Sequence, residues 1–403
     1  MIDLLGHAQG TRWFGSRPAA VIATALTGWW VRPEGEDGVG VRSAFLDVVF
    51  DGEPARFHVP LGYVPAGSAT SEVLGTEEVD GRPMHVVDAT AEHRCRLALF
   101  RALADGLPGF ELVRPLPSTD AETRRFGGEQ SNTTIVLGDA VMMKVFRRLE
   151  AGPNPDLECH RALAESGAVA VLYGRWHHEG QDLALAVELL PDPVDGYVAA
   201  VDTATSGGDF RDEAKALGVA LARVHRELAD ALGTDSVDGG ELRAALEQRL
   251  VEAVAEAPEL EPMVPALRRH YDAIAPTALP AQRIHGDCHL GQAIKARGSW
   301  YFVDFEGEPM VSLAVRRRPD LAVRDVAGML RSFGYAAASG SPEWLADCRT
   351  AFLDGYGALT EAEQQVLLAL EIDKACYEVR YERRYRPDMV HIPMSFLREL
   401  VAG

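Results

Sequence analysis

Three side chains that could carry out chemistry lie close together in residues 282–309, QRIHGDCHLGQAIKARGSWYFVDFEGEP. Asp287 follows a His-Gly pair, Gln292 comes five residues later, and Asp304 begins an Asp-Phe dipeptide after an aromatic and apolar run. Phosphoryl transfer needs a carboxylate that accepts the proton of an attacking hydroxyl, and oxygen ligands that hold Mg²⁺ against the phosphates. The spacing therefore predicts Asp287 as the general base, with Gln292 and Asp304 as magnesium ligands.

Two strands are expected to carry these side chains to one place. A strand ending near Ile284 would deliver Asp287 into a loop, and residues 300–303 predict a strand that returns after a turn at residues 296–298. Kinases usually have Asn where this chain has Gln292, but the longer amide still offers a carbonyl oxygen to a hard cation. The alternative is a buried loop whose Asp and His only satisfy turn amides. The spacings between Asp287, Gln292 and Asp304 all agree with those of a kinase catalytic loop, so together they favour the catalytic interpretation.

A second group of candidate residues lies on the strands and turns between residues 113 and 190. Lys144 lies within the apolar run VMMKVF, where a charge needs a partner or a ligand, and Glu158 opens a helix fourteen residues later. A strand lysine paired with a helix glutamate positions the α and β phosphates of ATP in kinases. The alternative is a lysine with its amine in solvent and an exposed glutamate.

The turn at residues 125–134, RFGGEQSNTT, contains small and hydroxyl-bearing residues that would let backbone amides approach phosphates. It is not a G-x-G-x-x-G motif, and an ordinary hairpin turn would look much the same. The apolar strand at residues 184–190 ends at Pro191, where the order of elements would place adenine. The residues expected to contact the nucleotide, besides Lys144 and Glu158, are Gly128, Gln130, Ser131, Glu188 and Leu190.

Composition limits the classes of function. The chain has 403 residues, 47% of them hydrophobic, enough for a large core and two or three structural units. Its 40 Lys and Arg against 60 Asp and Glu give a net charge of −20, which disfavours nucleic-acid and anionic-membrane partners. Five cysteines without a C-x-x-C pair indicate a reducing compartment. With no signal-peptide pattern and no apolar run of membrane-spanning length, we expect a cytoplasmic protein.

The chain is expected to have three parts. Residues 1–105 predict a cap of strands and a final helix at 91–104, without a catalytic constellation; its Trp13, Trp29 and Trp30 suit packing better than ligand binding. Residues 106–191 predict a nucleotide-binding lobe, and residues 192–403 a mainly helical lobe with the catalytic loop. The strands expected in the cap are residues 19–26, 43–50, 55–60 and 85–88, and the helices expected early in the last part are 210–232, 242–254 and 263–274.

Two later helices carry further candidates. A helix at residues 323–333 has Asp325 near its start, which would either lock the catalytic loop or cap the helix; His225 on an earlier helix is expected to be structural. Thr360 and Glu363 form a capping box that begins a long helix ending near Arg384. On that helix one polar face is either solvated or a sugar-binding wall. Its members are Lys374, Tyr377, Glu378, Tyr381 and Glu382.

Several long stretches resemble actinobacterial maltokinases and the related glucosamine kinases. They are HGDCHLGQ, DFEGEP, RRRPDLAVRDVAGMLRSF and DKACYEVRYERRYRPDMVHIP, together with GPNPDLE and RWFG, so the resemblance covers most of the chain. These enzymes are bacterial sugar kinases with an aminoglycoside-phosphotransferase-like fold. The resemblance implies an α+β, bilobal, protein-kinase-like chain with an N-terminal cap, ATP and Mg²⁺ as cofactors, and a sugar bound between the catalytic loop and the long helix. No obligate protein partner is indicated.

The sequence departs from the maltokinase pattern where the acceptor is chosen. Cys288 replaces a larger apolar residue, and Met389 an aromatic one. Because an acidic pocket suits a cationic amine, we expect D-glucosamine, giving glucosamine 6-phosphate, over maltose, giving maltose 1-phosphate. In the alternative, the carboxylates of this acidic pocket bind magnesium and nearby arginines such as Arg324, and the protein is a maltokinase. The expected sugar contacts are His289, Glu306, Glu308, Tyr377, Glu378, Tyr381 and Glu382.

Two other classes of function remain open. A protein kinase would need a peptide-docking segment after Asp304, but a helix is expected within about twenty residues. A non-catalytic nucleotide-binding module would be expected to lack Lys144, Asp287 or Asp304, and all three are present. The sequence therefore favours a kinase of small-molecule sugars.

Overall fold

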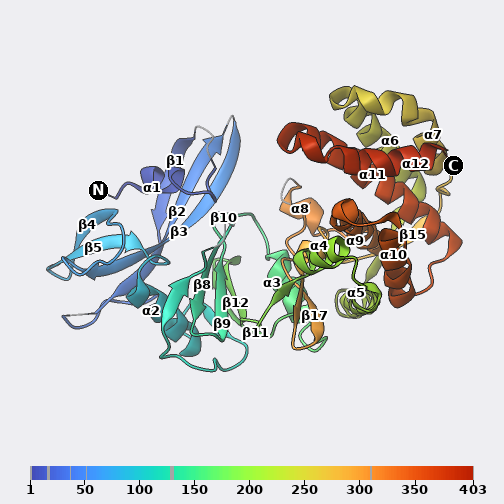
Figure 1. The fold of residues 1–403 in the computed structure, drawn as a ribbon. Coiled ribbons are helices and arrows are strands. Elements are labelled where there is room, and N and C mark those ends of the chain that lie inside the picture. The colour runs from blue at the N-terminus through green and yellow to red at the C-terminus, as the bar shows by residue number, and fades with distance from the viewer. Residues whose placement is uncertain are drawn as a thin grey trace. The chain divides into compact units, whose positions relative to one another are not determined.

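The computed structural model describes residues 2–15, 19–36, 38–50, 52–127, 131–308 and 311–402. The backbone divides into two compact units, one of residues 1–160 and 170–191, the other of residues 161–169 and 192–403. Strands prevail in the blue and green first unit, and helices prevail in the second (Figure 1). Among the described residues, no helix combines the length and the apolar character needed to cross a membrane.

The N-terminal sheet of the first unit is antiparallel, in the order β1-β2-β3-β5-β4, with β10 added beside β3. A short helix and one sheet face enclose an aromatic core in which Phe14 packs 4.8 Å from Phe57, ring centre to ring centre. Trp13 is buried in the same core, as its expected packing role requires. The bounds are α1 (Leu4–Gln9), β1 (Ala20–Leu26), β2 (Gly40–Phe50), β3 (Glu53–Pro65), β4 (Gly75–Val79), β5 (Arg82–Asp88) and β10 (Arg148–Leu149).

The second sheet of the first unit is also antiparallel, in the order β6-β11-β12-β9-β8-β7. Its strand β9 lies between β8 and β12 and carries Lys144, which stands opposite Thr134 on β8 and Leu185 on β12. Lys144 is thus held by strands on both sides. The bounds are α2 (His93–Ala104), β6 (Phe110–Leu112), β7 (Thr123–Arg125), β8 (Thr133–Leu137), β9 (Val141–Val145), α3 (Pro155–Ala162), β11 (Leu172–His178) and β12 (Gln181–Glu188).

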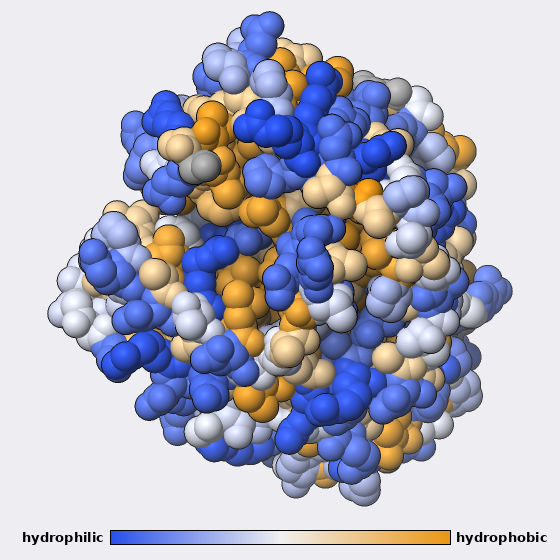
Figure 2. All heavy atoms as spheres, turned by 90° about the vertical axis from the view of Figure 1, so that its right-hand side faces the viewer, coloured by the Kyte–Doolittle hydropathy of each residue, from blue (hydrophilic) through white to orange (hydrophobic). Residues whose placement is uncertain are grey.

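Helices make up most of the second unit. Helices α5 and α10 approach closely at Gly218 and Gly355, where a Cβ atom would overlap the backbone of the other helix. Polar residues dominate the face seen in Figure 2, with hydrophobic patches between them. The longer helices are α4 (Gly196–Ser206), α5 (Arg211–Leu232), α6 (Gly239–Glu256), α7 (Val264–Asp272), α9 (Ala322–Ala336), α10 (Pro342–Tyr356), α11 (Glu361–Tyr385) and α12 (His391–Ala402).

Short strands complete the second unit and carry the predicted catalytic hairpin. Strand β16 (Ala293–Ala296) pairs with β17 (Ser299–Phe302) and with β13 (Val194–Asp195), and β14 (Thr234–Asp238) pairs with β15 (Ala278–Gln282). The turn of the hairpin contains Arg297 at φ 50° and Gly298 at φ 75°, as the sequence predicted. The strand before Asp287 ends two residues earlier than expected, because side chains rather than a neighbouring strand hold the backbone from residue 285 onward.

His58 on β3 is fully buried as a neutral ring. Its Nδ1 lies 3.3 Å from the Phe146 carbonyl oxygen, and its Nε2 lies 2.8 Å from Ser43 Oγ. A carbonyl oxygen can only accept, so Nδ1 donates and Nε2 accepts from the serine hydroxyl. Burial, reinforced by the charge of Arg147, lowers the pKa of His58 to about 3.

This depressed pKa makes folding stability depend on pH. Since the ordinary pKa is 6.5, the unfolded chain binds a proton between about pH 6.5 and 3 that the folded chain excludes. The contribution is therefore fully present above pH 6.5 and is lost as the pH falls. We expect His58 to account for about 2 kcal/mol of lost stability between pH 7 and pH 5.

Urea unfolding of wild type and His58→Gln at both pH values measures this effect. Tryptophan fluorescence is a suitable signal because the His58 ring lies 4.9 Å from that of Trp176. The loss of unfolding free energy on acidification should be smaller in His58→Gln by the amount given above, since all other titrating groups are shared. An equal loss in the two proteins would contradict a neutral buried His58.

Candidate active site

Asp325 on α9 fixes the backbone that precedes Asp287. Its carboxylate accepts hydrogen bonds from the backbone N–H groups of His285, at 2.7 Å, and Gly286, at 2.9 Å. It also lies 3.0 Å from His225 Nε2. Burial alone would raise the pKa of Asp325, but the His225 hydrogen bond and charge hold it below its usual value. Of the two roles left open by the sequence, the contacts agree with the first, because Asp325 holds the backbone of the loop predicted to be catalytic.

His285 connects the two ends of the hairpin. Its Nε2 lies 2.9 Å from the Val303 carbonyl oxygen, and its Nδ1 accepts from the Asp287 N–H at 3.3 Å. One ring therefore fixes Asp287 relative to the residue before Asp304. Gly286 makes the turn at φ 84°, a conformation that glycine adopts without steric cost. Asp287 itself remains half-buried, with its side chain 25% exposed.

The two predicted magnesium ligands lie together. The Gln292 amide nitrogen is 3.5 Å from Asp304 Oδ2, so a half-turn of the amide would direct its oxygen to the same place. The Val303 N–H donates to the Gln292 carbonyl oxygen at 3.0 Å, which joins the two segments through the backbone. Asp304 adopts φ 66°, a left-handed conformation that Asp tolerates better than most residues. These oxygen donors suit a hard divalent cation such as Mg²⁺.

A pocket of about 310 Å³ opens beside Asp287 within the second unit. Lys374 of α11 lies in it, with Nζ 2.9 Å from Glu308 Oε1 and 3.8 Å from Asp287 Oδ1. Burial would lower the pKa of Lys374, but Glu308 and Asp287 outweigh it and raise that pKa. The sequence placed Lys374 on the polar face of its helix without assigning it a role. The pocket also contains Arg324, which the sequence analysis named as a neighbour of the carboxylates, and basic groups that it did not place there: Arg249, Arg316, Arg318 and Arg380.

His289 and Glu306 belong to the same loops. Nδ1 of His289 accepts from the Gly291 N–H at 3.1 Å, and burial lowers the pKa of the ring. His289 is therefore neutral, with its proton on Nε2, which makes that atom a donor. Glu306 lies two residues after Asp304, and its carbonyl oxygen accepts from Arg316 Nη1 at 2.6 Å.

The polar face of α11 divides into two kinds of residue. Tyr377 and Tyr381 are 44% and 40% exposed, and their rings stack at 6.3 Å. Glu378 and Glu382 are instead buried against α9: Glu378 accepts from Arg331 at 2.7 Å and Glu382 from the Tyr335 hydroxyl at 3.0 Å. Helix periodicity predicted the shared face, but neither a wholly solvated face nor a sugar wall made of all these residues agrees with the two buried carboxylates.

In the first unit, Lys144 pairs with an acid that the sequence analysis did not single out. Its Nζ lies 3.0 Å from Asp156 Oδ2, in the first turn of α3. Burial would raise the pKa of Asp156, but Lys144 and His160 together hold it well below its usual value. The only available signal was the Asn-Pro-Asp sequence at the helix start. Glu158 lies in the same turn, and its pairing with Lys144 stays a prediction.

The remaining nucleotide candidates are only partly described. Gly128 and Gln130 lie outside the described residues, whereas Ser131 is exposed next to them. At the end of β12, the Glu188 N–H donates to Val171 and the Leu189 N–H donates to Ala140, at 2.8 and 2.9 Å. Leu190 is buried.

Comparisons with known proteins identify the family and several similar chains. A model of the phosphotransferase enzyme family matches residues 122–364, which include Lys144 and the catalytic hairpin. A glucosamine kinase of Mycolicibacterium smegmatis is 29% identical over 330 residues, covering 72% of this chain and 83% of the relative. A glucosamine kinase of Streptacidiphilus jiangxiensis is 28% identical over 401 residues, covering 88% of each.

A solved structure of a glucosamine kinase in complex with glucosamine, ADP and inorganic phosphate is also similar. It shares 25% identity with a TM-score of 0.70 and covers 94% of both chains. The α+β fold, the aminoglycoside-phosphotransferase-like architecture and the family resemblance inferred from the sequence are thereby confirmed.

Proposed function

Because the chain belongs to the phosphotransferase enzyme family, we propose that it is an ATP-dependent glucosamine kinase. It transfers the γ-phosphate to a hydroxyl of D-glucosamine and forms glucosamine 6-phosphate. The observation that carries this proposal is the pocket beside Asp287, where this carboxylate meets a second carboxylate, Glu308, and the ammonium group of Lys374. The names of the two relatives support the choice of sugar.

Asp287 acts as the general base. As the sugar oxygen attacks the γ-phosphorus, its proton passes to the carboxylate, and the bond between that phosphorus and ADP breaks. The backbone around Asp287 is fixed by Asp325 and His285, so the carboxylate meets the hydroxyl with little reorganisation. Lys374 Nζ lies 3.8 Å from Asp287 Oδ1, so attraction between the two charges helps to orient the carboxylate.

Residues of the first unit are assigned to the phosphates of the nucleotide. Lys144, kept in place by Asp156, donates to the phosphates, and Glu158, Ser131, Gly128 and Gln130 are assigned to the same nucleotide. Gln292 and Asp304 would hold Mg²⁺, which would neutralise negative charge on the phosphates.

Backbone groups at the end of β12 are proposed to receive adenine. The Glu188 and Leu189 N–H groups already donate within the sheet. Adenine is therefore assigned to the carbonyl oxygens at Glu188 and Leu189 and to the Leu190 N–H.

The acceptor pocket suits an amine. Glu308, half-exposed and already paired with the ammonium of Lys374, is the carboxylate best placed to accept from a sugar ammonium group. Tyr377 also borders the pocket, Tyr381 follows one turn later on α11, and His289 Nε2 donates to a sugar oxygen. Glu306 stays a predicted contact near Asp304. Glu378 and Glu382 are left out of the proposal because Arg331 and Tyr335 already engage them.

Steady-state ADP release with glucosamine, N-acetylglucosamine, glucose and maltose tests the function. If one charge-assisted hydrogen bond recognises the amine, kcat/KM for glucosamine should exceed that for glucose by about 10- to 150-fold. N-acetylglucosamine is the matched control, because it keeps the nitrogen but loses the charge. A preference for maltose would establish the runner-up, a maltokinase, and equal rates with glucose would refute recognition of the amine.

A further inference from the structure

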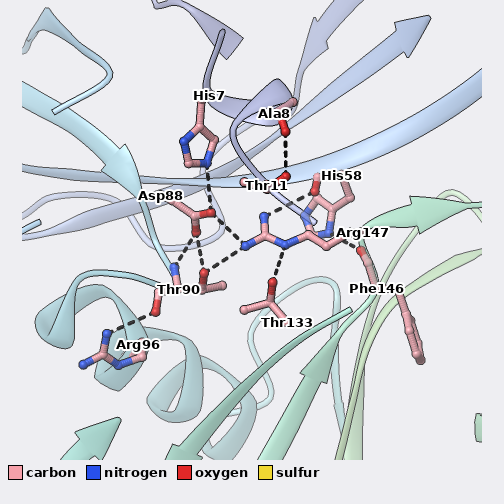
Figure 3. Close-up of polar contacts among 10 residues, drawn as sticks. All are labelled: His7, Ala8, Thr11, His58, Asp88, Thr90, Arg96, Thr133, Phe146 and Arg147. Atoms are coloured by element: carbon pink, nitrogen blue, oxygen red, sulfur yellow. Dashed lines mark hydrogen bonds and ion pairs between the residues drawn. The ribbon is translucent and has the colours of Figure 1, made fainter. Parts of the chain in front are cut away.

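Arg147 is a fully buried arginine between the two sheets of the first unit. It follows β9 and precedes β10, and its side chain has no exposed area. As Figure 3 shows, the guanidinium group donates in several directions: Nη2 lies 2.8 Å from Asp88 Oδ2 and 2.9 Å from Thr90 Oγ1. Nε lies 2.8 Å from Thr133 Oγ1 on the other side. One side chain therefore bonds to both sheets.

On the side of the N-terminal sheet, Asp88 connects three segments of the chain through hydrogen bonds. It ends β5, accepts from the Thr90 N–H at 2.8 Å and hydroxyl at 2.6 Å, and lies 3.3 Å from His7 Nε2 on α1. Burial alone would raise the pKa of Asp88, but Arg147 first, then His7 and Thr90, hold it well below its usual value. The position of Arg147 thus depends on the folded state of this N-terminal sheet.

On the other side, Arg147 holds the strands around Lys144. Besides the bond to Thr133, its backbone N–H donates to Asn132 Oδ1 at 3.2 Å. Asn132 lies directly before β8 and Thr133 is the first residue of that strand, on which Thr134 stands opposite Lys144. Arg147 itself lies three residues after Lys144 on the same chain segment. It therefore links both strands that would position the phosphates.

The energetics of burial favour a role for Arg147 in positioning its partners over a role in only holding the two sheets together. A buried ion pair gains little net stability, because desolvation offsets its attraction, and apolar residues would join two sheets equally well. A guanidinium group differs in its fixed, planar set of donors, which specifies the positions of several acceptors at once. Here those acceptors belong to β5, to the loop after it and to β8.

We propose that Arg147 is a positioning residue through which the N-terminal sheet fixes Lys144 and the end of the phosphate-binding turn, and thereby sets the affinity for MgATP. This inference rests on the proposed function in one respect, namely that this turn and Lys144 bind the nucleotide. It assigns to the sheet of residues 20–88 a part in nucleotide binding, although that sheet contributes no residue to the proposed site.

Two variants test the link. Thr133→Val removes only the hydroxyl that accepts from Arg147, and valine is a residue favoured in strands. Arg147→Lys keeps the positive charge but loses the planar guanidinium group with its fixed set of donors. Calorimetry with MgATP, without sugar, should show about tenfold weaker binding in each, the loss expected for one buried hydrogen bond that positions the site. KM for ATP should rise in parallel while KM for glucosamine stays within about twofold.

Thr11→Val is the matched control, since it removes a threonine hydroxyl in the same region that bonds to the Ala8 carbonyl and not to Arg147. It should bind MgATP as the wild type does. Lower melting temperatures with unchanged MgATP affinity in Thr133→Val would overturn the proposal and leave Arg147 a structural residue, and this variant decides the matter if Arg147→Lys does not fold. A wild-type chain that bound no MgATP would instead refute the proposed function.

Discussion

Asp287→Asn is expected to lower kcat about a thousandfold, the middle of the range for a general base, with little change in folding. The amide has nearly the same shape but cannot take the proton of the acceptor hydroxyl. The loop should survive the change because its backbone is fixed by Asp325 and His285, neither of which bonds to the Asp287 carboxylate in the contacts described above. Lys374 also keeps Glu308 as a partner at 2.9 Å.

Single-turnover kinetics with saturating MgATP and glucosamine measure this loss at the chemical step. Circular dichroism and thermal unfolding verify the fold, and Asp209→Asn, an exposed aspartate that pairs with Arg211, serves as a control that should retain full activity. A kcat within about tenfold of the wild type would show that a group other than Asp287 acts as the base. Glu308, in the same pocket, would then be the next residue to replace.

Local sequence spacing predicted the parts of the site that lie on one short segment. Asp287, Gln292 and Asp304 are separated by at most seventeen residues. A tight turn at residues 297 and 298 returns the chain, so the proximity of Gln292 and Asp304 follows from hairpin geometry, and His285 joins Asp287 to the same segment. The capping box of Thr360 and Glu363 was predicted for the same reason, because both partners lie within one helical turn. Such features depend on residues only a few positions apart.

Partners distant in sequence could not be predicted in this way. Periodicity placed Glu378 on a face of α11 but could not show that Arg331, 47 residues earlier, would cover that face and bury it. The sequence also could not decide whether Asp325 caps its helix or holds the loop, because the Gly286 N–H that it accepts from lies 39 residues earlier in the chain. Arg147 and Asp88, 59 residues apart, carried no motif at all, since a buried ion pair needs only complementary positions in the folded chain.

Replacement of Asp304 tests the other half of the mechanism, and Asn is the informative substitute. Asp304 has φ 66°, where Ala would add backbone strain of its own, whereas Asn tolerates the left-handed conformation and keeps the size of the side chain. Asp304→Asn should therefore fold normally. It loses the negative charge that holds a divalent cation, and we expect kcat/KM to fall by about a thousandfold, because metal ions contribute several kcal/mol to stabilising the transferred phosphate.

Calorimetric titration of ATP with and without Mg²⁺ separates the causes of that loss. In the wild type, Mg²⁺ should strengthen ATP binding, and in Asp304→Asn this gain should largely disappear, while binding of metal-free ATP stays similar. Lys144→Ala is the contrasting variant, since its lost ammonium should weaken ATP binding whether or not Mg²⁺ is present. If Asp304→Asn kept the full magnesium-dependent gain, Asp304 would not be a metal ligand. Gln292, whose amide already lies 3.5 Å from Asp304, would then need a different partner for the cation.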